Sequence, residues 1–123
     1  MCGICGVFGG SDSGLIDKMN KVMFYRGPDD SGTFNDELVS LGIRRLSIID
    51  RAGGHQPIHN EDESVWVVCN GEIYNYRSLR DELEKLGHRF YTASDTEVAV
   101  HSYDEWGDTF PQRLNGMFAI AIY

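Results

Sequence analysis

Long apolar runs and an excess of basic residues are both missing from this sequence. No stretch approaches the ~20 apolar residues that a membrane-spanning helix requires, so no contact with a membrane is expected. The 11 basic side chains are outnumbered by 19 acidic ones, and the resulting net charge of −8 would repel a phosphate backbone. Nucleic acid is therefore not an expected partner. The N-terminus also lacks the basic and apolar regions of a secretory signal, which predicts a cytoplasmic location.

Cysteine and proline are scarce as well, with three residues of each among 123. An odd number of cysteines (Cys2, Cys5 and Cys69) in a chain without a secretion signal argues against a disulfide framework and for free thiols. No repeat, linker or low-complexity segment divides the chain. With 41% apolar and 24% charged residues, the composition is typical of globular proteins, and the length suits one domain.

The hydrophobic pattern predicts strands and helices that alternate along the chain. Short apolar stretches predict strands over 2–9, 32–34, 38–46, 65–69, 89–91 and 116–123. Apolar residues at helical spacing predict helices over 13–25, 78–86 and 94–106, with 50–62 as a loop. The last helix is expected to start at Ser94 with a capping box that Glu97 completes. Short connections between such elements are typical of an α+β layered domain.

The most reactive candidate side chain stands at the second position of the chain. Removal of Met1 is usual when the next side chain is small, and it would leave Cys2 with both a thiol and a free α-amine. The reference pKa values of these two kinds of group differ by about one unit or less, so a proton can pass between them near neutral pH. Cys2 would then carry nucleophile and base together, and no histidine would be required. Retention of Met1 would remove the base.

Attack of a thiolate on a carboxamide places negative charge on the amide oxygen, and this charge needs preorganised hydrogen-bond donors. Asn70 and Gly71 follow a strongly apolar strand, and their side-chain and backbone N–H groups can meet at one oxygen. Arg45 offers a planar fork for a carboxylate, and Glu72 and Asp95 offer negative charge for an ammonium group. Taken singly, these residues also have ordinary interpretations. Asn70-Gly71 is a common turn pair, and Arg45 could be an exposed charge on a strand. Glu72 could be a solvated loop acid, and Asp95 an acid in the first turn of a helix.

Five motifs in a fixed order give a more specific signal than any single residue. They are Met1-Cys2-Gly3-Ile4-Cys5-Gly6, Arg26-Gly27-Pro28-Asp29-Asp30-Ser31-Gly32, Arg44-Arg45-Leu46-Ser47-Ile48-Ile49-Asp50, Asn70-Gly71-Glu72-Ile73-Tyr74-Asn75 and Ser94-Asp95-Thr96-Glu97. In this order they resemble the class II glutamine amidotransferases, most closely the glutaminase domain of glutamine-hydrolysing asparagine synthetases. The resemblance implies an N-terminal nucleophile hydrolase, whose α+β fold is a four-layer αββα sandwich.

The same resemblance implies one class II glutaminase domain over 1–123, incomplete at its C-terminal end and without its synthetase domain. The implied reaction is hydrolysis of glutamine to glutamate through a Cys2 thioester. The ammonia would serve asparagine synthesis from aspartate in an ATP-dependent synthetase domain or partner chain. ATP and Mg²⁺ would act only there, and no cofactor or metal is expected in this chain. A homo-oligomer is compatible with this interpretation.

The resemblance also implies a role for each site residue. Cys2 corresponds to the nucleophile, and Arg45 corresponds to the residue that holds the substrate carboxylate. The remaining positions would form the oxyanion hole (Asn70, Gly71), contact the substrate amino group (Glu72, Asp95) or line the pocket with backbone groups (Leu46, Ile48).

Other interpretations stay open from the sequence. The glutaminase could serve a sugar phosphate or phosphoribosyl diphosphate, or the chain could be a non-catalytic module of the same fold. Cys2-x-x-Cys5 and His55-x-x-x-His59 imitate the ligand spacing of a zinc site, although ~50 residues separate the two pairs. A redox pair of cysteines would be expected at the start of a helix, whereas these two fall in a predicted strand. Cys5 and Cys69 are expected to be structural.

Overall fold

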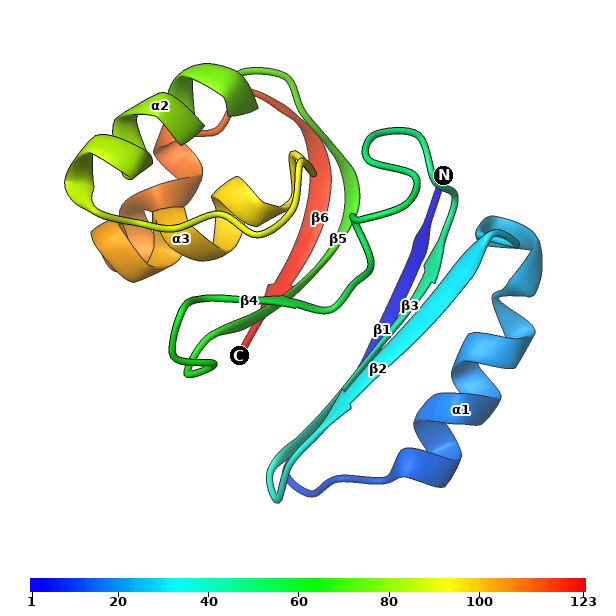
Figure 1. Ribbon diagram of the computed structural model, residues 1–123. Coiled ribbons are helices and arrows are strands. Elements are labelled where there is room, and N and C mark those ends of the chain that lie inside the picture. Colours follow the sequence, from blue (N-terminus) through cyan, green and yellow to red (C-terminus); the bar gives the residue numbers. More distant parts are fainter.

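The computed structural model describes residues 1–123, which form two antiparallel sheets and three α-helices (Figure 1). The first sheet has the strand order β1-β3-β2, with β1 at Gly3–Phe8, β2 at Asp30–Asn35 and β3 at Val39–Arg45. The second has the order β4-β5-β6, with β4 at Ile58–His59, β5 at Trp66–Ile73 and β6 at Gly116–Ile122. The helices are α1 (Ser13–Val22), α2 (Tyr76–Leu86) and α3 (Glu97–Trp106), and 3₁₀ turns cover Phe24–Arg26 and Gly107–Arg113. None of the helices combines the length and the apolar character needed to cross a bilayer.

Helix α1 covers the outer face of the first sheet (Figure 1). The helix begins after Asp12, whose carboxylate accepts a hydrogen bond from the backbone N–H of Leu15 at 2.8 Å. Its buried face contributes Ile16 and Asn20, and the Asn20 side chain donates to the carbonyl of Gly32 in β2. A Cβ at Gly42 in β3 would lie 2.9 Å from the Asn20 side-chain oxygen, so a glycine there lets the helix approach the sheet closely.

The two sheets face one another and bury a second apolar layer between them. Val39, Leu41 and Ile43 of β3 pack in one cluster with Val68 of β5. At the far end of this layer, the ring of Phe34 in β2 stacks on Trp66 in β5 with 4.5 Å between ring centroids. Because β3 is the middle strand of its sheet and is covered on both faces, nearly all of its residues are buried.

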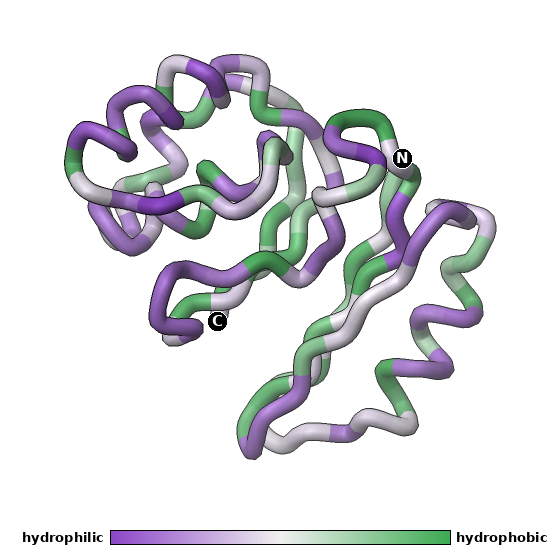
Figure 2. Tube along the Cα trace, viewed as in Figure 1, coloured by the Kyte–Doolittle hydropathy of each residue, from purple (hydrophilic) through white to green (hydrophobic).

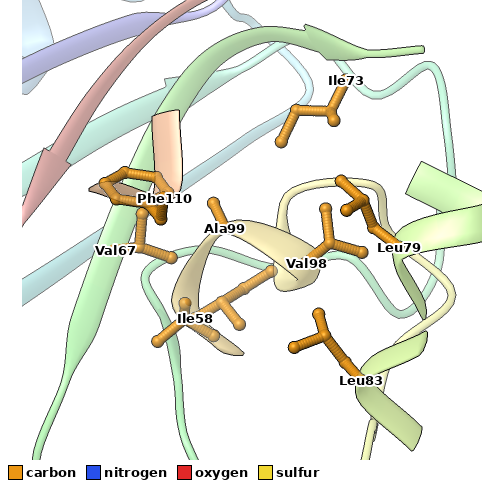
Figure 3. Close-up of a cluster of buried hydrophobic side chains, with 9 residues drawn as sticks. Ile58, Val67, Ile73, Leu79, Leu83, Val98, Ala99 and Phe110 are labelled. Carbon is orange, nitrogen blue, oxygen red and sulfur yellow. The ribbon is translucent and has the colours of Figure 1, made fainter. Parts of the chain in front are cut away.

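Helices α2 and α3 cover the outer face of the second sheet and close the largest apolar cluster (Figure 3). Along the Cα trace, α1 and α2 alternate between hydrophilic and hydrophobic residues, as helices with one buried face do (Figure 2). Leu79 and Leu83 are the buried residues of α2, which ends at Gly87 in a left-handed conformation with φ of 108°. The members of the cluster are Ile58, Val67, Ile73, Leu79, Leu83, Val98, Ala99, Val100 and Phe110.

The order of layers is therefore α1, first sheet, second sheet, and α2 with α3. This arrangement confirms the predicted α+β class and the four-layer αββα sandwich. Two details of the prediction are wrong. The segment 50–62, predicted as a loop, contains β4, because Ile58 pairs with Val67 and continues the second sheet by a short strand. Strand β5 does not end at Cys69 but continues through Asn70 and Gly71 to Ile73, because β6 pairs with it along that whole length.

The predicted strand over 89–91 and the predicted capping box are also wrong, for one shared reason. The carboxylate of Glu97 accepts hydrogen bonds from the backbone N–H groups of Tyr91 at 2.8 Å and Thr92 at 2.7 Å. These amides are thereby satisfied without a neighbouring strand, and Glu97 does not reach back to the N–H of Ser94, which donates to the hydroxyl of Thr92 instead. Helix α3 accordingly begins at Glu97.

Candidate active site

One cavity is lined by every residue that the sequence predicted for the site. Its walls come from the start of the chain, the end of β3 with the loop that follows, β5, and the segment before α3. In Figure 1 the N-terminus lies beside the loop that follows β3. No histidine lines this cavity. The predicted residues in its lining are Cys2, Arg45, Leu46, Ile48, Asn70, Gly71, Glu72 and Asp95.

The thiol of Cys2 is half-buried and held by the backbone of Leu46. The Leu46 N–H donates to Cys2 Sγ at 3.3 Å, and Sγ lies 3.7 Å from the Leu46 carbonyl oxygen. In the first sheet, Gly3 of β1 pairs with Arg44 of β3. This register brings Cys2, which precedes β1, close to Leu46, which follows β3. Met1 is 59% exposed at the mouth of the cavity, so its removal would uncover the Cys2 amine without disturbing the core.

Cys2 and Cys5 do not form a pair. Side chains alternate between the faces of a strand, and Cys5 lies on the α1 side, where its Sγ is 3.6 Å from the side-chain oxygen of Asn20. His55 instead pairs with Asp30, and the ring of His59 bonds the carbonyl of Asn60. The zinc arrangement of Cys2, Cys5, His55 and His59 is therefore not assembled.

Gly71 gives the cavity lining an unusual backbone conformation. Its φ is 152°, and a Cβ at this position would lie 2.1 Å from the carbonyl oxygen of Met117 in β6. Only glycine fits between the two strands there. Asn70 precedes it, and the Asn70 side-chain oxygen is buried without a hydrogen-bond partner, while no side-chain or backbone group of the chain accepts from its amide nitrogen.

The hydrogen-bond pattern of β5 leaves one backbone donor at the cavity. Trp66 exchanges both backbone bonds with Tyr123, so alternate residues along β5 bond to β6 and the residues between them point their N–H groups away from β6. Of these, Cys69 donates to the side-chain oxygen of Gln56 at 2.7 Å and Ile73 donates to Asp95 at 2.8 Å. Gly71 lies between them without such a side-chain acceptor, so its N–H is free for a ligand.

Arg45 supplies a buried cation at the end of β3. The residue is 5% exposed, and its Nη2 donates to the carbonyls of Ile49 at 2.7 Å and Asp50 at 2.8 Å. A Cβ at Gly54 would lie 2.5 Å from Nη2, so the loop closes over the guanidinium only because a glycine stands there. No carboxylate of the chain lies within ion-pair distance of Arg45. Burying a cation in this way is costly unless an anion joins it.

Two acids, Asp95 and Glu72, also line the cavity. Asp95 is 6% exposed, and burial raises the pKa of its carboxyl, with the negative charge of Glu72 acting in the same direction. A cation bound between the two acids would remove this repulsion. Burial, reinforced by the charge of Asp95, raises the pKa of Cys69 to about 12, so Cys69 remains a neutral thiol.

Further residues line the cavity without having been predicted as site residues, Gln56 and Met117 among them. Gln56 is 4% exposed and links the backbone of Cys69 to the hydroxyl of Thr96, which fixes β5 against the start of α3. Met117 contributes from β6. Gln56 lies in a segment predicted as a loop and Met117 in a plain apolar strand, so neither stood out in the sequence. Their positions depend on contacts between distant segments.

Two facing sheets lie between outer helices, and the thiol at the second position lines the same cavity as Asn70 and Gly71. A family model described as "Glutamine amidotransferase domain" matches residues 1–123. The chain belongs to this family of glutamine amidotransferase domains.

Curated relatives extend the comparison. The glutamine-hydrolysing asparagine synthetase 1 of Bacillus subtilis (strain 168) is 47% identical over 130 residues, which cover 100% of this chain and 21% of that protein. The glutamine-hydrolysing asparagine synthetase 2 of Oryza sativa subsp. japonica is 43% identical over 127 residues, covering 99% of this chain and 21% of the relative. The chain thus spans about a fifth of the length of the curated relatives it matches.

Solved structures share the fold. The glutamine phosphoribosylpyrophosphate amidotransferase from B. subtilis, complexed with ADP and GMP, aligns with a TM-score of 0.77 at 19% identity, over 98% of this chain and 34% of that one. A structure described as the allosteric regulatory enzyme of purine biosynthesis aligns with a TM-score of 0.57 at 24% identity, over 72% of this chain and 22% of that one. At these identities the likeness concerns the fold alone.

Proposed function

We propose that residues 1–123 act as a class II glutaminase domain that hydrolyses the side-chain amide of glutamine to glutamate and ammonia. One observation carries the proposal: the guanidinium of Arg45 is buried in the wall of the Cys2 cavity without a carboxylate from the chain. A buried cation of this kind favours a ligand that brings its own carboxylate, as an amino acid does. Membership of the glutamine amidotransferase domain family supports glutamine as that amino acid.

The proposed reaction begins at Cys2 once Met1 has been removed. The α-amine takes the thiol proton, and the sulfur attacks the δ-carbonyl carbon of glutamine. The carbon–nitrogen bond breaks, and the protonated amine returns its proton to the departing nitrogen, which leaves as ammonia. Water then cleaves the thioester, which releases glutamate and restores the thiol. The absence of histidine from the cavity lining is consistent with a base on Cys2 itself.

In this proposal Asn70 and Gly71 stabilise the negative charge that develops on the amide oxygen. The Asn70 side-chain amide and the Gly71 backbone N–H are both without a protein acceptor and line the same cavity as the thiol. Because both donors belong to a paired strand, they are fixed before the substrate arrives. Such fixed donors cost no reorganisation during the reaction, which makes them effective in stabilising charge.

The α-carboxylate and the α-ammonium of the substrate, which are attached to the same carbon, would bind neighbouring groups of the cavity lining. Arg45 would hold the α-carboxylate through the guanidinium nitrogens that the loop carbonyls leave free. Asp95 and Glu72 would hold the α-ammonium, which relieves the repulsion between these two acids. Backbone groups at Leu46 and Ile48 would complete the lining of the pocket around the substrate.

Replacing Arg45 by alanine is expected to raise the KM for glutamine roughly 100-fold or more, because the substrate carboxylate loses its buried partner. The kcat should change much less, since Arg45 does not touch the reacting amide. Glutamate release measured across a range of glutamine concentrations separates the two constants. Arg44→Lys is the matched control, because the neighbouring Arg44 bonds the carbonyl of Gly27 and lies outside the cavity. An unchanged KM in Arg45→Ala would show that Arg45 does not bind the substrate carboxylate.

Replacing Asn70 by alanine is expected to lower kcat by about 10²- to 10³-fold, the usual cost of one lost oxyanion donor. The KM should stay close to that of the unchanged protein, because the oxyanion exists only along the reaction path. Asn75→Ala serves as a control, since the Asn75 side chain bonds Arg113 and Asn115 away from the cavity. A kcat that falls equally in both variants would point to a general loss of structure instead.

The ammonia is proposed to serve asparagine synthesis from aspartate. Support comes from relatives named asparagine synthetases, of which this chain matches about a fifth. The acceptor chemistry, with ATP and Mg²⁺, is assigned to a synthetase domain or partner chain beyond these residues. Free Cys2, Cys5 and Cys69 suit a reducing compartment, so the proposed location is the cytoplasm.

A further inference from the structure

A second group of chemically reactive side chains lies on the helical side of the second sheet. Glu61 comes from the turn between β4 and β5, His88 follows the end of α2, and His101 lies on α3. One ligand atom from each residue lies within 4.8 Å of the other two. The His101 side chain is completely buried, yet its Nδ1 has no hydrogen-bond partner. A buried ring nitrogen without a partner, directed at an acid and a second histidine, requires an explanation.

The distances within this group differ from those of ordinary ion pairs. One carboxylate oxygen of Glu61 lies 3.4 Å from His88 Nδ1, and the other lies 3.5 Å from His101 Nδ1. Charge-assisted hydrogen bonds are typically ~2.7 to 2.9 Å long, so neither contact is a good one. Two ligand atoms of a tetrahedral zinc ion, each bound at ~2.0 to 2.1 Å, lie about 3.3 Å apart. Each of the two oxygen–nitrogen distances is close to that value, and the three ligand atoms together lie within 4.8 Å of one another.

The outer nitrogen of each histidine is oriented by a further carboxylate. His88 Nε2 lies 3.1 Å from Glu105, and His101 Nε2 lies 3.3 Å from the buried Glu97. An Nε2–H that donates to a carboxylate leaves the Nδ1 lone pair free to bind a metal. Metal-binding histidines almost always have such a partner, which fixes the ring and its tautomer. Here both histidines have it, and both Nδ1 atoms are turned toward Glu61.

We propose that Glu61, His88 and His101 form a zinc site, with Glu97 and Glu105 as its supporting carboxylates. Two imidazole nitrogens and one carboxylate are a donor set typical of Zn²⁺ with a water as the fourth ligand. The ion joins the β4–β5 turn to α3 and to the segment after α2, where the Arg89 N–H already donates to Glu61 at 2.7 Å. None of the three ligands lines the Cys2 cavity, so the site holds the outer layer together and takes no part in glutamine hydrolysis.

The test is calorimetric titration of the chelator-treated, metal-free protein with Zn²⁺ alone. We expect one ion to bind per chain and to raise the melting temperature. His88→Gln and Glu61→Gln should each weaken binding by more than about 100-fold, beyond the usual loss from a supporting residue. Glu105→Gln should weaken it by about 10- to 100-fold. His55→Gln is the matched control, because this exposed histidine pairs with Asp30 elsewhere, and its affinity for zinc should not change.

Circular dichroism of each variant establishes that it is folded before its affinity is compared. His88 and Glu61 are chosen because they are less buried than His101, so their replacement disturbs the core less. Absence of saturable zinc binding would overturn the proposal and leave the group as a cluster of side chains without a bound ion. Binding that survives in both ligand variants, or that disappears in Cys2→Ala, would also overturn it, since the ion would then lie elsewhere.

Discussion

Replacing Cys2 by alanine is expected to abolish glutamate release from glutamine while leaving the fold intact. The loss should be at least roughly 10⁴-fold, because the residue that forms the covalent intermediate has no substitute. Cys69 lines the same cavity but is almost completely buried, and burial with the charge of Asp95 raises its pKa to about 12. Burial also raises the pKa of Cys5, whose thiol lies on the α1 side of the first sheet. Neither thiol can attack in place of Cys2.

The measurement is the rate of glutamate formation by purified protein, with circular dichroism and thermal unfolding as checks on the fold. Cys5→Ala is the matched control, because it removes a nearby thiol, three residues along the chain, and should keep most of the activity. Undiminished turnover by Cys2→Ala would disprove the mechanism proposed for this cavity.

Insertion of a lysine between Met1 and Cys2 is expected to reduce turnover by about 10²- to 10⁴-fold, the usual contribution of a positioned base. A long second side chain prevents removal of Met1, and the nitrogen of Cys2 then stays in a peptide bond. The thiol is still present in this variant, so the prediction separates the base from the nucleophile. Met1 is exposed, and the added residue should extend into solvent rather than disturb the sheets.

A rescue experiment controls for damage by the insertion. A cleavable leader placed before Cys2 should give inactive protein, and protease treatment that leaves Cys2 as the first residue should restore activity. Turnover that is the same before and after cleavage would show that another group accepts the proton. Intact mass before and after treatment establishes which N-terminus is present.

Much of the fold could be predicted from local patterns in the sequence. The apolar strand ending at Tyr123 and the amphipathic helix with Leu79 and Leu83 follow from residue spacing alone. The segment 89–91 could not be predicted in the same way, because its amides bond the buried carboxylate of Glu97 rather than a strand. The length of β5 was likewise set by its pairing with β6, which no local pattern records.

In the site, too, residues with a signal in the sequence could be predicted, whereas residues placed by contacts between distant segments could not. Cys2, Arg45 and Asn70 were predicted from their chemistry and from family motifs, and they line one cavity in the structure. The sequence placed Asn70 and Gly71 after a strand, whereas the structure places them within it and so explains why the Gly71 N–H is free. Gln56 was missed, because a loop glutamine carries no signal until its partner at Cys69 is known.

The proposed zinc ligands were missed for a related reason. Glu61, His88 and His101 are far apart in the sequence and match none of the short spacings by which metal sites are found. The sequence drew attention to Cys2 and Cys5 instead, which lie on different faces of the first sheet. Only the packing of α3 against the β4–β5 turn brings the three ligands together.

The most direct test of the central claim is mass spectrometry of the active protein after reaction with a diazoketone analogue of glutamine. One adduct per chain is expected, on the sulfur of Cys2, in molecules from which Met1 has been removed. Molecules that retain Met1 should remain unlabelled in the same sample. An adduct on Cys5 or Cys69, or equal labelling of chains that still begin with Met1, would contradict the claim that Cys2 supplies both nucleophile and base.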